Sequence, residues 1–158
     1  MRIRFSLRHV LIATSLVACC CAWFAVNTVR RQSEIRSVRN LGEVAGTKVF
    51  VGDGEHPFGG CGTWFDGIIV HIDDFAPRAI KPLKLDCTKR VTSIEMKCRN
   101  DVALFEVVSK FPHLQSLYVQ RRTAALDPDE GIDPFTEALI AFCNSHPGTE
   151  VVFWGDED

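Results

Sequence analysis

An uncharged apolar run near the start of the chain limits the fold more than any other feature. Residues 10–26 contain no charged side chain, and arginines stand on both sides of them. As a helix, these residues would be about 26 Å long, close to the thickness of the hydrocarbon core of a bilayer. The run therefore predicts a transmembrane helix over residues 10–29. The expected anchor residues are Val10, Leu11, Leu16, Trp23 and Val26, with Trp23 placed where interfacial aromatic residues are common.

Two alternatives to a retained helix stay open. A cleaved signal peptide also begins with basic residues, but its apolar core is shorter and ends at a small-x-small site. Here residues 23–26 continue the apolar run past any such site. The segment Leu-Val-Ala-Cys at 16–19 is similar to a bacterial lipobox, although the residues after it stay apolar. A lipoprotein tethered at Cys19 is therefore a second hypothesis for membrane attachment.

Charge is divided unevenly along the chain. Residues 1–40 carry seven arginines and one glutamate, a net charge of +6, whereas residues 41–158 carry 11 basic and 19 acidic residues, a net charge of −8. A basic segment suits anionic lipid headgroups, and an acidic domain argues against nucleic acid as a partner. We expect a basic tail over 1–9, a juxtamembrane helix over 30–42 and one folded domain over 43–158.

The orientation in the membrane is only weakly indicated. Three arginines precede the apolar run and four follow it closely, so the positive-inside rule hardly discriminates. We expect a single-pass protein whose short tail is cytoplasmic and whose acidic domain lies outside the cytoplasm.

Short β-branched runs alternate with helix-like stretches in the second half of the chain. This alternation predicts an α/β domain with mainly parallel strands. Asp133 followed by Pro134 is a typical start for the second of the two expected helices. The expected strands are 68–72, 91–98, 114–120 and 150–154, and the expected helices are 101–111 and 134–145.

The strand segments are related by a degenerate repeat. Residues 91–96 match residues 114–119 at an offset of 23, with apolar side chains at the first, fourth and sixth positions. Offsets of 24 toward the N-terminus and 35 toward the C-terminus extend the repeat to Val70 and Val152. A period of 20–29 residues with this spacing is typical of leucine-rich repeats.

Two segments resemble short membrane-anchored leucine-rich-repeat proteins of environmental bacteria. Arg-Phe-Ser-Leu-Arg at 4–8 leads directly into the apolar run, and Phe-Pro-His-Leu-Gln-Ser-Leu-Tyr-Val at 111–119 is similar to the repeat junction of that family. The resemblance implies a membrane helix followed by a small leucine-rich-repeat-like domain, without an assigned activity or catalytic residues. The chain departs from the family at Arg99 and Arg122, where an asparagine is expected.

In this register the strands turn one side to the core and the other outward. Val152 and Trp154 would point inward. Leucine-rich-repeat proteins commonly bind partners on the outward strand face, which indicates a protein-interaction module for an unknown protein partner, without catalysis. Tyr118 and Phe153 would be its aromatic anchors, unless a loop covers them. The expected surface residues are His71, Glu95, Lys97, Tyr118, Gln120 and Phe153.

Little in the sequence indicates catalysis, a cofactor or a metal. The segment from Gly52 to Gly62 has five glycines but lacks the lysine and hydroxyl residue of a phosphate loop. His56 and Cys61 within it give the alternative function, a hydrolase or metal-dependent enzyme using this loop. The acidic residues at 127–133 do not fit a calcium loop. The four cysteines outside the anchor have no C-x2-C pair, which argues against zinc. An even count would permit two disulfides outside the cytoplasm, but the irregular spacing favours buried free thiols.

Overall fold

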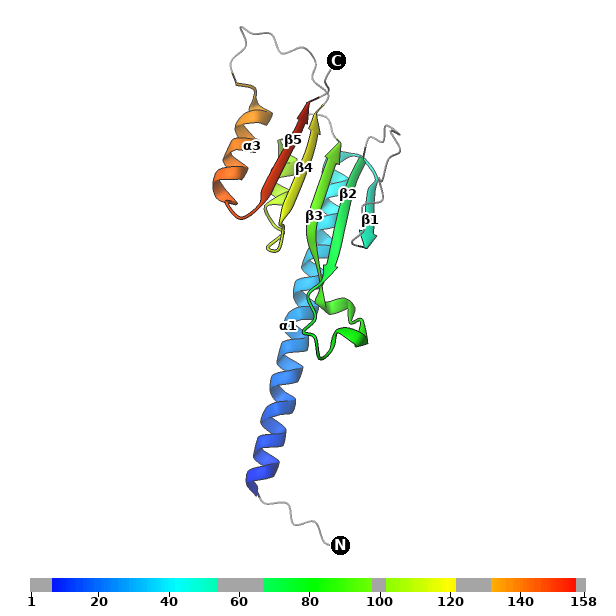
Figure 1. The fold of residues 1–158 in the computed structure, drawn as a ribbon, viewed down its shortest axis with the longest axis vertical. Helices are drawn as coiled ribbons and strands as arrows, with labels where there is room; N and C mark the ends of the chain where they lie inside the picture. The colour runs from blue at the N-terminus through cyan, green and yellow to red at the C-terminus, as the bar shows by residue number, and fades with distance from the viewer. Residues whose placement is uncertain (1–6, 54–66, 98–101, 122–131, 156–158) are drawn as a thin grey trace.

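A single long helix at the amino-terminal end of the described residues runs into the folded domain. The computed structural model describes residues 7–53, 67–97, 102–121 and 132–155. Helix α1 (Leu7–Ala45) has 39 residues and no break. Its amino-terminal half projects away from the rest of the chain, and its carboxyl-terminal half lies against a sheet (Figure 1). The expected membrane span and juxtamembrane helix are thus parts of one helix.

In the part of the chain that the structure describes, five strands form one mixed sheet in the order β1-β2-β3-β4-β5. The pair β2–β3 is antiparallel, and the other three neighbouring pairs are parallel. The expected α/β layout with mainly parallel strands is confirmed in the described residues, whereas a leucine-rich-repeat fold stays a prediction. The strands are β1 (Val49–Asp53), β2 (Gly67–Asp74), β3 (Lys89–Lys97), β4 (Ser116–Arg121) and β5 (Glu150–Gly155).

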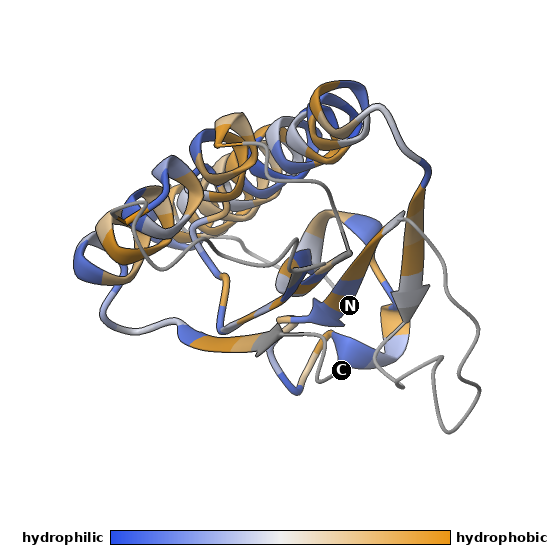
Figure 2. Ribbon diagram, turned by 90° about the horizontal axis from the view of Figure 1, so that it is seen from above, coloured by the Kyte–Doolittle hydropathy of each residue, from blue (hydrophilic) through white to orange (hydrophobic). Residues whose placement is uncertain are grey.

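Helices cover one face of this sheet. Helix α2 (Ala103–Val108) connects β3 to β4, and α3 (Pro134–Ser145) precedes β5. Figure 2 shows both helices and α1 on the same side of the strands. The expected cap is confirmed, because Asp133 Oδ1 accepts hydrogen bonds from the amides of Phe135 and Thr136. Side chains that are fully buried between the helices and the sheet include Leu41, Ile68, Val70, Ile94, Leu104 and Leu117.

The repeat correctly gives the register of two strands. Ile94 on β3 lies directly beside Leu117 on β4, which is the expected offset of 23. Both side chains are fully buried. The connection through α2 is short, and the strand on each side of it has a single pattern of apolar residues. The sequence alone therefore predicts this pairing.

The extension of the repeat to β2 is wrong. Ile72 was expected to correspond to Met96 in a parallel neighbour, but it pairs with Val91, and Met96 pairs with Ile68, in an antiparallel ladder. The β2–β3 connection (residues 75–88) holds only two short 3-10 turns, η1 (Lys81–Leu83) and η2 (Asp86–Thr88). Since it contains no crossover helix, the chain returns from the end at which β2 finishes, which makes the strands antiparallel.

The extension of the repeat to β5 is wrong by one residue. Leu117 pairs with Val151 rather than Val152, and Val119 pairs with Phe153. Val151 packs against the core, so Val152 lies on the opposite face, in register with Tyr118. Trp154, expected to point inward, is in register with Gln120. Because strand side chains alternate, a shift of one residue exchanges the two faces of the whole strand.

Candidate functional site

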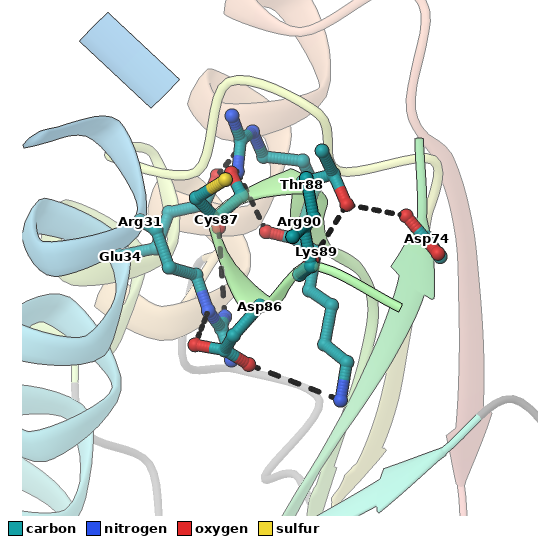
Figure 3. A network of polar contacts seen from close by, with 9 residues as sticks. Arg31, Glu34, Asp74, Asp86, Cys87, Thr88, Lys89 and Arg90 are labelled. Carbon is teal, nitrogen blue, oxygen red and sulfur yellow. Dashed lines mark hydrogen bonds and ion pairs between the residues drawn. The ribbon is translucent and has the colours of Figure 1, made fainter. Parts of the chain in front are cut away.

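Charged side chains are buried where α1 meets the start of β3 (Figure 3). Arg31 and Glu34 come from α1, three residues apart and therefore on one face of the helix. Arg90 comes from β3. The three residues are only 9%, 4% and 3% exposed, respectively. Charged residues are rarely buried to this extent without partners, so their contacts define the junction between the helix and the domain.

Arg90 holds this junction together through several contacts. Its Nη2 donates to Asn27 Oδ1 at 2.6 Å, and its Nη1 donates to the carbonyl oxygens of Cys87 and Lys89 at 2.8 and 2.7 Å. Its Nε lies 3.9 Å from Glu34 Oε1. One side chain from the sheet therefore contacts α1 at two positions that are two helical turns apart.

Glu34 lies between two arginines. Arg31 Nη1 is 3.9 Å from Glu34 Oε2, and Arg31 Nε is 3.5 Å from Asp86 Oδ2. These distances are those of ion pairs rather than hydrogen bonds. Burial raises the pKa of Glu34, and the positive charge of Arg90, a hydrogen bond with the Val91 backbone and the positive charge of Arg31 offset only part of that effect.

Hydrogen bonds close the β2–β3 connection at its two ends. Thr88 Oγ1 lies 2.6 Å from Asp74 Oδ1, which also accepts from the Ala76 amide at 2.9 Å. The Phe75 amide donates to the Thr88 carbonyl at 3.1 Å. The bonds from Thr88 and then Ala76 lower the pKa of Asp74. The connection is thus an ordered loop whose base is fastened to the sheet.

The expected interaction surface is partly assembled. His71, Glu95, Tyr118 and Gln120 share the face of the sheet that the helices leave uncovered, because Glu95 pairs with Tyr118 and His71 Nε2 lies 3.2 Å from Glu95 Oε1. His71 is buried and the other three are half-buried. Together with Val152, these four residues are named the outer face here.

The other two members of the expected surface are Phe153 and Lys97. Phe153 was expected on the outer face, but the register places it on the helix side, beside Val119, where it is 45% exposed. Lys97 is in register with Gln120. Val152 was missed because the repeat assigned it to the core, and no signal in the sequence distinguishes the offsets of 34 and 35.

The expected anchor residues are exposed on α1. Val10, Leu11, Leu16 and Val26 are 48–62% exposed, and Trp23 is 38% exposed. In the described part of the chain, α1 is long and apolar enough to cross a membrane, a property that signal sequences share. Cys19 lies inside this helix and is exposed, and its lipidation stays a prediction.

The described residues offer little for metal or redox chemistry. They contain no group of three or more His, Cys, Asp or Glu side chains that could hold a metal ion. Cys87 is buried and Cys143 is exposed, and both are free thiols. Of the proposed catalytic loop, only Gly52 and Asp53 are described. His56, Cys61 and the rest of the segment up to Gly62 lie outside the described residues.

A shallow groove lies beside the base of the β2–β3 connection. It is lined by Phe75, the segment 109–115 and the segment 146–149. The ring centroids of Phe75 and His113 are 5.4 Å apart, and burial, with the charges of Arg90 and Arg30, lowers the pKa of His113.

Comparison with protein-family models, with curated proteins and with solved structures gives no match to this chain.

The junction predicts a strong coupling between Glu34 and Arg90. Arg90→Met should lower the free energy of unfolding by about 3–5 kcal/mol, because it leaves a buried carboxylate with one long ion pair. The double variant Arg90→Met/Glu34→Gln should be less destabilised than Arg90→Met alone. Urea unfolding of the full chain in detergent measures both. Glu106→Gln, which removes a solvent-exposed ion pair with Lys110, should change the stability by less than about 1 kcal/mol. Simple additivity of the two junction substitutions would contradict the coupling.

The two shifted carboxyl groups predict opposite pH dependences. The pKa of Glu34 is above its ordinary 4.5, so its contribution to stability is complete below that pH and is lost as the pH rises through the folded-state pKa. The pKa of Asp74 is below 3.8, so its contribution is present above that pH and is lost as the pH falls. Wild type should therefore lose stability relative to Glu34→Gln as the pH rises, and relative to Asp74→Asn as the pH falls. Urea midpoints at several pH values test this, and parallel curves would refute it.

Proposed function

We propose that the chain is a single-pass membrane protein in which α1 carries a small α/β domain that serves as a protein-interaction module rather than an enzyme. The observation that carries this proposal is the unbroken course of α1. Its first half exposes apolar side chains, whereas Leu41 in its second half is fully buried in the domain core. The same helix is therefore suited to lipid at one end and to protein at the other.

The exposed half of α1 is apolar around its whole circumference. Leu11, Ile12, Leu16 and Val17 are each more than half exposed, and they point in different directions around the axis. A helix that is hydrophobic on all sides needs an apolar surrounding. The described residues of the domain do not cover this half, because the apolar window of α1 is not buried at all. These features support a membrane span.

The junction supports a fixed placement of the domain. Asn27 directly follows the apolar run at 10–26 and accepts a hydrogen bond from Arg90 on β3. From Asn27 to Leu41 the helix rises about 21 Å along the sheet. Since α1 has no break between these residues, the domain would stand close to the bilayer and keep one orientation to it. We place the acidic domain outside the cytoplasm, in line with the basic tail at 1–9.

The proposed contact region for a protein partner is the part of the outer face on β4 and β5. Tyr118, Gln120 and Val152 are half-buried there, and the helices lie on the other side of the sheet (Figure 2). Tyr118 is the aromatic residue best placed to act as an anchor, since tyrosines often carry interface energy. Val152 replaces Phe153 in this proposal. The kinship with anchored leucine-rich-repeat proteins stays a hypothesis, supported by the parallel β3-α2-β4 unit.

Charge placed in the exposed half of α1 should release the protein from membranes. Each aspartate in Leu16→Asp/Val17→Asp costs roughly 2.5–3.5 kcal/mol in a span, so most of the chain should appear in the soluble fraction after a carbonate wash. Ile35→Asp is the matched control, because Ile35 is also exposed on α1 but lies beyond the span; it should stay bound. Release of the wild type, or a mature chain that begins after the apolar run, would refute the anchor.

Photo-crosslinking should distinguish the outer face from the helix side. With p-benzoylphenylalanine at Tyr118 in the full chain, illumination of intact cells should give a discrete adduct with a second protein. The same group at Phe153, which is also aromatic but on the opposite side of β5, should not give this adduct. Mass spectrometry identifies the attached peptide. An attachment of position 118 to this chain alone would show that the outer face is covered from within and would refute the contact region.

A further inference from the structure

The β2–β3 connection carries a charge opposite to that of the domain it belongs to. Residues 75–85 contain Arg78, Lys81 and Lys84 and no acidic residue, whereas residues 41–158 as a whole have a net charge of −8. All three basic residues are exposed. Leu83, between two of them, is 65% exposed, although a leucine in a loop gains nothing from contact with water. Residues 78–84 of the connection, here called the tip, therefore expose both basic and apolar side chains to solvent.

The position of the connection relative to α1 is fixed by its carboxyl-terminal end. Asp86 Oδ2 lies 3.5 Å from Arg31 Nε, and Arg90, just beyond the connection, donates to Asn27 at 2.6 Å. Asn27 directly follows the apolar run at 10–26, near the end of the expected span. These contacts, drawn for Arg31, Asp86 and Arg90 in Figure 3, bring the base of the connection to the height at which α1 would leave the hydrocarbon core.

The rest of the connection extends farther in the same direction. Figure 1 shows the connection extending beyond the ends of the strands toward the amino-terminal end of α1, and its η2 turn is the part that packs against that helix. If α1 crosses the bilayer with the apolar run at 10–26 in the hydrocarbon core, the tip of the connection lies within the headgroup region of the same bilayer. The argument rests on the proposed function, because α1 must span the membrane for this geometry to apply.

The tip is held in shape by its own backbone. The amides of Ile80 and Lys81 donate to the Pro77 carbonyl at 2.9 and 3.0 Å, and the Lys84 amide donates to the Lys81 carbonyl at 3.1 Å. Lys84 has a φ of 47°, a left-handed conformation that a non-glycine residue adopts at some cost. A preformed turn loses little conformational entropy when it binds, so the exposed side chains are presented ready for contact.

We propose that the β2–β3 connection is a second membrane contact, which binds anionic phospholipid headgroups beside α1 through Arg78, Lys81 and Lys84 and inserts Leu83 into the interface. The ammonium and guanidinium groups can pair with lipid phosphates. Near an anionic membrane surface, each basic residue raises the binding constant about fivefold. The connection would then keep the acidic domain from tilting away from the bilayer about the end of the span.

The test uses the full chain in vesicles of phosphatidylcholine, alone or mixed with phosphatidylglycerol. An environment-sensitive fluorescent amino acid replaces Leu83, and a quencher is attached to the lipid at headgroup depth. We expect strong quenching and a blue shift in the anionic vesicles, weaker quenching in phosphatidylcholine alone, and a decrease with added salt. Flotation of the vesicles reports separately on whether α1 anchors the chain.

Charge reversal supplies the matched comparison. Lys81→Glu/Lys84→Glu should reduce quenching of the label in anionic vesicles by tenfold or more, while the chain still floats with them. Lys48→Glu is the control, because Lys48 is exposed and follows the carboxyl-terminal end of α1. That end of the helix is about 27 Å from Asn27 along the helix axis. It should leave the quenching unchanged.

Three results would overturn the proposal, and they differ from one another. A floating chain whose label is not quenched shows that the tip stays in water. Equal quenching with and without phosphatidylglycerol, unaffected by Lys81→Glu/Lys84→Glu, shows that the tip does not recognise anionic lipid. A chain that does not float at all refutes the anchor itself, and this inference with it.

Discussion

The ion pairs of one buried carboxylate determine how the two halves of this molecule fit together. Glu34 on α1 lies between Arg31 of the same helix and Arg90 of β3. Removing these charges from water is costly, and the raised pKa of Glu34 reflects this. Leaving any one of them unpaired would cost more. The arrangement therefore favours one rotation and one height of α1 relative to the sheet.

The rest of the architecture follows from this placement. With α1 held against β3, its carboxyl-terminal half joins α2 and α3 on one face of the sheet, and the outer face points away from them (Figure 2). The same contacts carry the β2–β3 connection along α1 toward its exposed apolar half (Figure 1). If α1 spans a bilayer as we propose, this unbroken helix sets which surfaces of the acidic domain would meet the bilayer and which would stay available to a protein.

The sequence predicted those parts of the fold that depend on neighbours along the chain. The apolar run, the Asp133 cap of α3 and the offset between Ile94 and Leu117 are each set by short spacings. The direction of β2 and the register of β5 were predicted wrongly. The β2–β3 connection contains apolar residues at repeat positions, such as Leu83, but these are exposed in a loop. For β5, Val151, Val152 and Phe153 are all apolar, so no alternation shows which of them faces the core.

The sequence by itself therefore determined an exposed apolar helix, an α/β domain of opposite charge and most of the residues on the outer face. Only the tertiary structure decided that α1 continues unbroken into the core, that Glu34 is buried between Arg31 and Arg90, and that Val152 rather than Phe153 lies beside Tyr118. The physical reason is the same in each case. Burial of a charge and the register of a strand depend on side chains that are distant in sequence, and those meet only when the helix and the sheet have packed together.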